Sequence, residues 1–114
     1  MIVVKDKIKI LELQEMAKKM RPNLVKAMVD VQKEIMAVDG GLHADLMEFL
    51  IDTENSDPKN VWGINLYPDE SSENFIEFDS VMNIRPDLGN KSRGVESVEL
   101  QNKIKEIVIK LVEK

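Results

Sequence analysis

The hydrophobic residues of this chain change their spacing twice along the sequence. From Ile10 to Pro22 they recur every three or four residues, which predicts a helix that ends before the proline. From Leu24 to Ile84 they alternate in several short runs, which is typical of β-strands with one apolar face. After Ser97, a residue type that caps helices, they return to the helical period. The stripe of this final helix comprises Leu100, Ile104, Ile107, Val108 and Leu111.

The middle of the chain predicts strands at residues 24–31, 35–38, 61–67 and 75–84, and residues 2–8 fit a short first strand or an extended arm. Residues 32–34 leave room for a turn but contain no Gly or Asn, so a bulged hairpin is favoured over one long bent strand. Residues 42–53 fit either a helix or a strand.

Two amphipathic helices around four to five strands with short polar turns predict an α+β fold. The economical arrangement has two layers: an antiparallel or mixed sheet, with the N-terminal and C-terminal helices packed on one face. The other face would carry polar side chains and could expose Trp62 or Phe78 to a partner. The chain, residues 1–114, suits a single domain.

Composition excludes several classes of function. The chain has no cysteine and one histidine, which excludes disulfide scaffolds, thiolate or multi-histidine metal sites and thiol catalysis. The net charge of −5 argues against a nucleic-acid binder. No apolar run approaches the length of a membrane span, and the start does not have the order of a secretory signal. We therefore expect a cytoplasmic protein without a cofactor.

The charge is unevenly distributed. Residues 34–80 hold one basic and twelve acidic side chains, whereas residues 1–33 and 81–114 are both net positive. One interpretation is that acidic loops attract basic helices within the fold, and the other is an acidic face for a cation or a basic partner.

The loop at Asn83–Arg93 is the first candidate site, because it concentrates hydrogen-bond donors. Arginine offers a planar fork that suits carboxylate or phosphate, and Gly89 and Gly94 allow backbone amides to approach an anion. A small anionic ligand would be bound here, close to the start of the final helix. The alternative is that the arginines pair with the acidic middle segment. The donor side chains are Arg85, Asn90, Lys91 and Arg93.

The second candidate is His43 with Asp45, which would lie on the same side of a strand. A carboxylate beside an imidazole is the arrangement of general-base catalysis, although most such pairs are structural. Together with Glu77 and Asp79 they could form an oxygen-rich site for a divalent ion, but we predict no metal site.

A longer stretch carries a family resemblance. The run from Phe75 through Ile84-Arg85-Pro86, continued by Gly89–Arg93, is similar to a motif of small prokaryotic proteins catalogued only as a domain of unknown function. The residues Val61–Pro68 also resemble that family. The chain departs from the family pattern at Lys91, where the pattern has an arginine. The resemblance covers nearly the whole chain and implies a fold unit without an assigned activity.

We expect a small protein that binds a ligand or a partner, with an anion site formed by Arg85, Asn90 and Arg93 beside His43 and Asp45. The first alternative is a small hydrolase-type enzyme with His43 as base, Asp45 as its orienting group, and Arg85 or Arg93 stabilising negative charge. The second is a homodimeric structural or regulatory subunit, since the stripe of the final helix is wide enough for a dimer face.

Overall fold

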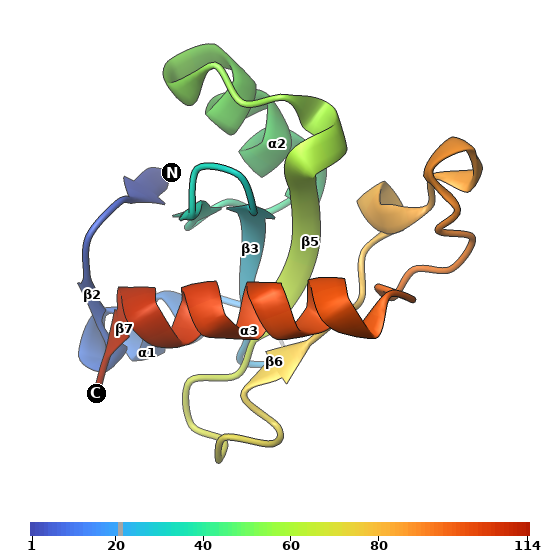
Figure 1. Cartoon of the computed structure of the whole chain (residues 1–114). Coiled ribbons are helices and arrows are strands. Elements are labelled where there is room, and N and C mark those ends of the chain that lie inside the picture. The colour runs from blue at the N-terminus through green and yellow to red at the C-terminus, as the bar shows by residue number, and fades with distance from the viewer. Residues whose placement is uncertain (21) are drawn as a thin grey trace.

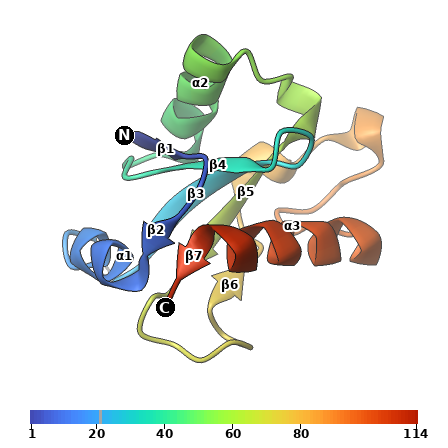
Figure 2. The ribbon, with the colours of Figure 1, turned by 60° about the vertical axis from the view of Figure 1, so that its left-hand side comes forward.

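The structure is a computed structural model that describes residues 1–20 and 22–114. Its centre is a five-stranded antiparallel sheet of order β1-β4-β3-β5-β6, with helices on both faces (Figure 1 and Figure 2). The sheet strands are β1 (Ile2–Val4), β3 (Val25–Asp30), β4 (Ile35–Val38), β5 (Val61–Leu66) and β6 (Ile76–Glu77). The helices are α1 (Ile10–Ala17), α2 (His43–Glu54) and α3 (Val98–Leu111). The predicted α+β class and antiparallel sheet are confirmed.

β3 and β4 form the predicted hairpin, and the side chain of Asp30 stabilises its turn in place of the Gly or Asn that residues 32–34 lack. Its carboxylate accepts the backbone N–H groups of Gln32 and Lys33, each at 2.9 Å. Glu34 adopts a left-handed conformation with φ of 58°, a position for which glycine or asparagine is the usual residue. A short polar side chain that binds the backbone therefore stabilises a tight connection without glycine.

The two faces of the sheet pack against different helices. Buried side chains of α1 and α3 share one core cluster with Ala27 and Ile64, whereas those of α2 share another with Met28 and Ala37. Helix α2, in the segment that fitted helix or strand equally, thus adds a layer on the face expected to be polar. Trp62 is only 6% exposed, so the expectation that it could face a partner was wrong.

The strand predicted at residues 75–84 pairs with β5 only over Ile76–Glu77. Beyond that point the chain leaves the sheet and forms a 3-10 turn at Val81–Asn83. At Gly63 the side chain of Asn83 makes the hydrogen bonds with β5 that a neighbouring strand would make. Its Oδ1 accepts the N–H of Gly63 at 2.8 Å, and its Nδ2 donates to the carbonyl of Gly63 at 2.9 Å.

Helix α3 begins where the sequence predicts, because Ser97 Oγ accepts the N–H of Leu100 at 3.2 Å. The chain continues directly into β7 (Val112–Glu113), which pairs in parallel with β2 (Ile8–Lys9) (Figure 2). The described helices do not include one with the length and hydropathy needed to cross a membrane.

Ion pairs join the acidic middle of the chain to the basic segments on either side. The carboxylate of Glu34 contacts the ammonium groups of Lys103, at 3.1 Å, and Lys110. Hydrogen bonds from Lys110 and then Lys103 lower the pKa of Glu34 below its ordinary value. Further pairs of this kind are Lys5–Glu54 and Arg93–Asp79. These contacts support the first interpretation of the uneven charge, in which acidic and basic segments attract one another within the fold.

Candidate functional site

Asn90 organises the loop that the sequence selected for anion binding. Its Nδ2 donates to three backbone carbonyls of the same segment, those of Asn83, Ser92 and Gly94, at 2.7, 3.2 and 2.8 Å. Its Oδ1 accepts the N–H of Glu96 at 2.9 Å. With every polar atom of this buried amide engaged, Asn90 holds the loop together, and ligand binding by this residue stays a prediction.

The backbone amides of the loop already bind an anion, and it belongs to the chain itself. One carboxylate oxygen of Glu96 accepts the N–H groups of Lys91 and Ser92, the latter at 2.9 Å. The hydrogen bonds from Lys91 and then Ser92 lower the pKa of Glu96 below its ordinary value. An internal carboxylate therefore occupies these two amides, and the binding of an external anion in this loop stays a prediction.

Arg85 is tied into the fold rather than presented to solvent. Its Nη2 donates to the carbonyl of Val61 at 2.6 Å, and its Nε donates to that of Met82 at 3.0 Å. Its guanidinium lies 4.7 Å from the centroid of the Trp62 ring, a cation–π distance. Burial lowers the pKa of Arg85, an effect that Asp87 partly opposes. Arg85 pairs with backbone and an aromatic ring instead of the acidic middle segment.

Arg93 behaves as the structural alternative predicted. Its Nε donates to Oδ1 of Asp79 at 2.6 Å, and this hydrogen bond raises the pKa of Arg93 above its ordinary value. The side chain is otherwise largely exposed. Arg85 and Arg93 thus bind different partners, so they do not form one anion clamp.

His43 and Asp45 begin a helix, which overturns the strand geometry proposed for them. Residues two apart on a helix point in different directions, and here His43 is buried while Asp45 is exposed. The Nε2 atom of His43 lies 2.8 Å from the carbonyl oxygen of Ile64. Burial lowers the pKa of His43, and the hydrogen bond to Ile64 partly opposes this shift. A neutral imidazole that donates from Nε2 to this carbonyl accounts for both observations.

The surroundings of His43 bring together only part of the predicted site. The charges of Lys26 and Arg93 lower the pKa of His43 and that of Asp79 raises it, so these groups lie near the imidazole. Of the main cavities lined by the residues that the structure describes, none contains more than one of the four residues proposed for the hydrolase-type enzyme.

The carboxylates of Glu77 and Asp79 are used by neighbouring side chains. Oε1 of Glu77 accepts from Asn65 Nδ2 at 2.9 Å and from the Tyr67 hydroxyl at 3.0 Å, while Asp79 pairs with Arg93. Within residues 1–20 and 22–114, no group of three His, Asp or Glu side chains is placed to hold a metal ion.

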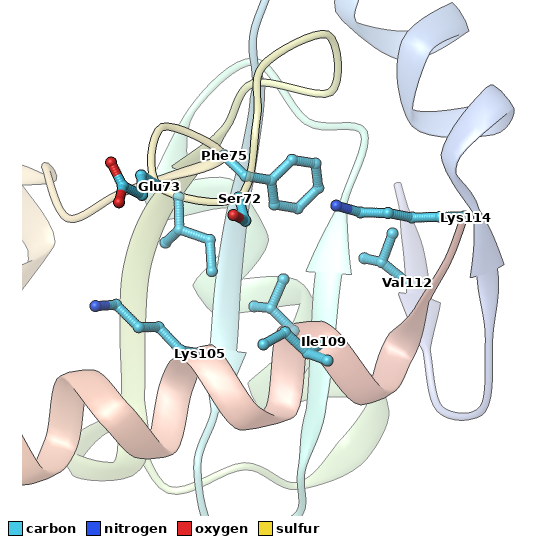
Figure 3. A pocket seen from close by; sticks show the side chains of 9 residues that line it. Ser72, Glu73, Phe75, Lys105, Ile109, Val112 and Lys114 are labelled. Atoms are coloured by element: carbon cyan, nitrogen blue, oxygen red, sulfur yellow. The ribbon is translucent and has the colours of Figure 1, made fainter.

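A cavity that none of these residues lines lies between α3 and the segment 72–76 that leads into β6 (Figure 3). Its volume of about 540 Å³ falls in the range of small-molecule sites. Its walls are mostly apolar, and Ile109 is 73% exposed. The apolar lining consists of Phe75, Ile76, Val108, Ile109 and Val112.

The charged residues of this pocket are two lysines and one acid. Lys114 Nζ lies 5.0 Å from the centroid of the Phe75 ring, so the ammonium extends across the pocket (Figure 3). Lys105 and Glu73 complete the charged lining, and the hydroxyl of Ser72 is the remaining polar side chain. The pocket therefore combines an apolar interior with excess positive charge.

This pocket was not among the predicted sites, although α3 carried a signal for it. Ile109 and Val112 are apolar but lie outside the predicted core stripe, which indicates more apolar surface than the sheet covers. Residues 72–76 approach α3 only through the fold, and most of this segment belonged to a stretch that the sequence marked as a polar turn. The wide stripe was interpreted as a possible dimer face instead.

Comparison with known proteins gives the family of the chain. Neither a search of curated proteins nor one of solved structures found a match. The model of a family described as a protein of unknown function, DUF5674, matches residues 2–111. That match covers nearly the whole chain and confirms the expected relationship to a domain of unknown function: the chain belongs to this family.

Proposed function

We propose that this protein is a small non-catalytic binding protein, and that its ligand is a largely apolar small molecule held between α3 and residues 72–76. The observation that carries the proposal is the apolar cavity of about 540 Å³. Sites for small molecules are concave, mostly apolar, and provided with a few polar groups that orient the ligand. This cavity has all three properties.

The chemistry of the lining favours binding over turnover. The polar side chains are Ser72, Glu73 and the two lysines, and the only histidine of the chain does not line the pocket. The serine is exposed in a polar turn, and no hydrogen bond joins it to a base among the described residues. A nucleophile without a base is a weak nucleophile, so the pocket lacks the parts of a hydrolase site.

The position of the pocket gives it one rigid wall. Val108 belongs to the buried face of α3, and Phe75 is 5% exposed at the base of the segment opposite. Both side chains belong to the main core cluster, so one wall is fixed by the packing of the domain. A preformed wall reduces the ordering cost of binding.

The test uses Nile red, an uncharged dye that becomes fluorescent in apolar surroundings. We expect saturable binding by the wild-type chain and its loss in Ser72→Trp, because an indole at this exposed lining position fills the pocket. Ser71→Trp is the matched control, since Ser71 is a neighbouring exposed serine outside the lining.

Dye binding that is absent in the wild-type chain, or equally strong in Ser72→Trp, would contradict the proposal. Circular dichroism of both variants checks that the fold is retained, and only variants that unfold like the wild-type chain are compared. If Ser72→Trp fails this check, Ile109→Asp at the exposed rim replaces it, with Ile109→Ala as its control.

A further inference from the structure

The two lysines of the pocket lie on opposite sides of its apolar lining along the chain. Lys105 precedes Val108, Ile109 and Val112, and Lys114 follows them. Figure 3 shows the two ammonium groups well separated, with Lys105 and Glu73 toward one end of the pocket and Lys114 toward the other. A ligand lying along α3 would therefore meet Lys105 and Glu73 at one end and Lys114 alone at the other.

Neither lysine is neutralised by an ion pair within the described part of the chain. This contrasts with Lys103 and Lys110 of the same helix, which both contact Glu34. The charged side chains of the lining, two lysines and Glu73, are net positive, whereas the side chains of the whole chain sum to −5. Unpaired cations at an apolar site are the complement of an anionic group on a hydrophobic ligand.

The two ammonium groups differ in where they are held. That of Lys114 lies over Phe75, which lines the pocket, at 5.0 Å from the ring centroid. That of Lys105 lies 5.9 Å from the ring of Phe78, which does not line it. Glu73 also stands at the Lys105 end in Figure 3 and offsets its charge. Lys114 is therefore the cation that faces the interior of the site.

We infer that the ligand is an amphiphile with a carboxylate head and an aliphatic tail, the head bound by Lys114 and the tail lying along Val108 and Ile109. This inference rests on the proposed function and adds the ligand class and its orientation. The aliphatic character follows from the lining beyond Phe75, which consists of isoleucine and valine, with the Ser72 hydroxyl as the one uncharged polar side chain.

The test measures displacement of Nile red by decanoate, decan-1-ol and decylamine, each below its micelle concentration. We expect decanoate to bind about fivefold more tightly than the alcohol, as an exposed charge pair allows, and the amine to bind most weakly. The preference for decanoate should shrink as salt is added, since the pair lies at the rim.

Two charge-removing variants form a matched pair. Lys114→Gln should weaken decanoate about fivefold and leave the alcohol unchanged, whereas Lys105→Gln should change either by about twofold or less. Lys114→Arg retains the charge and should restore the affinity for decanoate. This rescue distinguishes a charge contact from a loss of packing against Phe75.

The outcomes distinguish a wrong ligand class from a wrong binding pocket. If the alcohol displaces the dye as well as decanoate does, or if Lys105→Gln and Lys114→Gln have equal effects, the inference is wrong and the proposed pocket stands. If none of the three compounds displaces the dye and Ser72→Trp does not abolish dye binding, the proposed function itself fails.

Discussion

Asn83 and Gly63 exchange two hydrogen bonds in the manner of residues on adjacent strands. The glycine N–H donates to Oδ1 of the asparagine, and the asparagine Nδ2 donates back to the glycine carbonyl. Both residues are buried, and Nδ2 also donates to the carbonyl of Arg93 at 3.0 Å. One amide side chain thereby continues the pairing of β5 and ties the loop before α3 to the sheet.

This arrangement predicts that Asn83→Asp destabilises the protein by about 3 kcal/mol. One carboxylate oxygen can still accept from the N–H of Gly63, but the other replaces the donor to the carbonyls of Gly63 and Arg93. Urea unfolding followed by circular dichroism measures the loss. Asn102→Ala, at an exposed position of α3, is the control and should change stability by no more than about 0.5 kcal/mol. An Asn83→Asp protein as stable as the control would show that the hydrogen bonds contribute little.

Gly63 has no room for a side chain, because a Cβ there would lie 2.5 Å from Cβ of Ser80. We expect Gly63→Ala to cost about 2 kcal/mol through overpacking. Ser80→Gly removes the opposing atoms. By itself this change destabilises the protein, because the hydrogen bond from the N–H of Met82 to Ser80 Oγ is lost. The double variant should therefore be more stable than the sum of the two single effects by about 1 kcal/mol, measured in a double-mutant cycle. Additive effects would show that the cost of Gly63→Ala does not come from a steric clash with Ser80.

Glu96 occupies the amides of Lys91 and Ser92, so Glu96→Ala should free an anion site in that loop. We expect a lower thermal midpoint in this variant, and a partial recovery with sulfate relative to chloride at equal ionic strength. Glu106→Ala, which removes an exposed carboxylate of α3, should show no such recovery. Equal sulfate effects in both variants would indicate non-specific salt stabilisation.

The pKa of Glu96 gives the same contact a pH dependence. Because this pKa is lowered in the folded state, the unfolded chain takes up its proton first as the solution becomes acidic. The contribution of Glu96 to stability is complete when the pH is above the ordinary pKa of a glutamate, near 4.5, and is lost as the pH falls below that value toward the lowered pKa of the folded state. The difference in stability between the wild-type chain and Glu96→Ala should shrink over that range.

His43 controls stability at a higher pH, because its pKa lies below the ordinary value of 6.5. The unfolded chain binds its proton more readily, so stability should be greatest above pH 6.5 and fall as the pH drops toward the folded-state pKa. His43→Gln keeps a donor for the Ile64 carbonyl and removes the titration. Since the chain has one histidine, unfolding between about pH 7 and pH 5 should lose most of its pH dependence in this variant. An unchanged slope would assign the effect to other groups.

The elements with strong periodicity could be predicted because local pattern and tertiary environment agree in them. The stripe of α3 faces the core, and the alternation of β5 separates Trp62 and Ile64 from Val61. Helix α2 was ambiguous because Leu46, Phe49 and Leu50 satisfy a helical face within a run short enough for a strand. What decides is the apolar sheet face that this segment covers, and no local pattern reports it.

The last strand was overestimated for a different reason. Alternation describes side chains and says nothing about which backbone groups are free, and those of Gly63 are taken by Asn83. The same limit applies to the candidate site. The residue types at Arg85, Asn90 and Arg93 were suited to anions, but carbonyls, an aromatic ring and Asp79 engage these side chains, with the exception of Nη1 of Arg85. Sequence composition counts donors, whereas availability depends on contacts between distant segments.

The parallel pairing of Ile8 with Val112 has a consequence for the order of folding. Joining these positions closes a loop of almost the entire described chain, whereas the β3–β4 hairpin closes a short one. We therefore expect β7 to dock last and to detach first, ahead of any opening of the sheet. Val112 and Lys114 belong to this last segment to dock. A ligand bound in the pocket would therefore stabilise the docking of β7, which we expect to be the first contact of the domain to open.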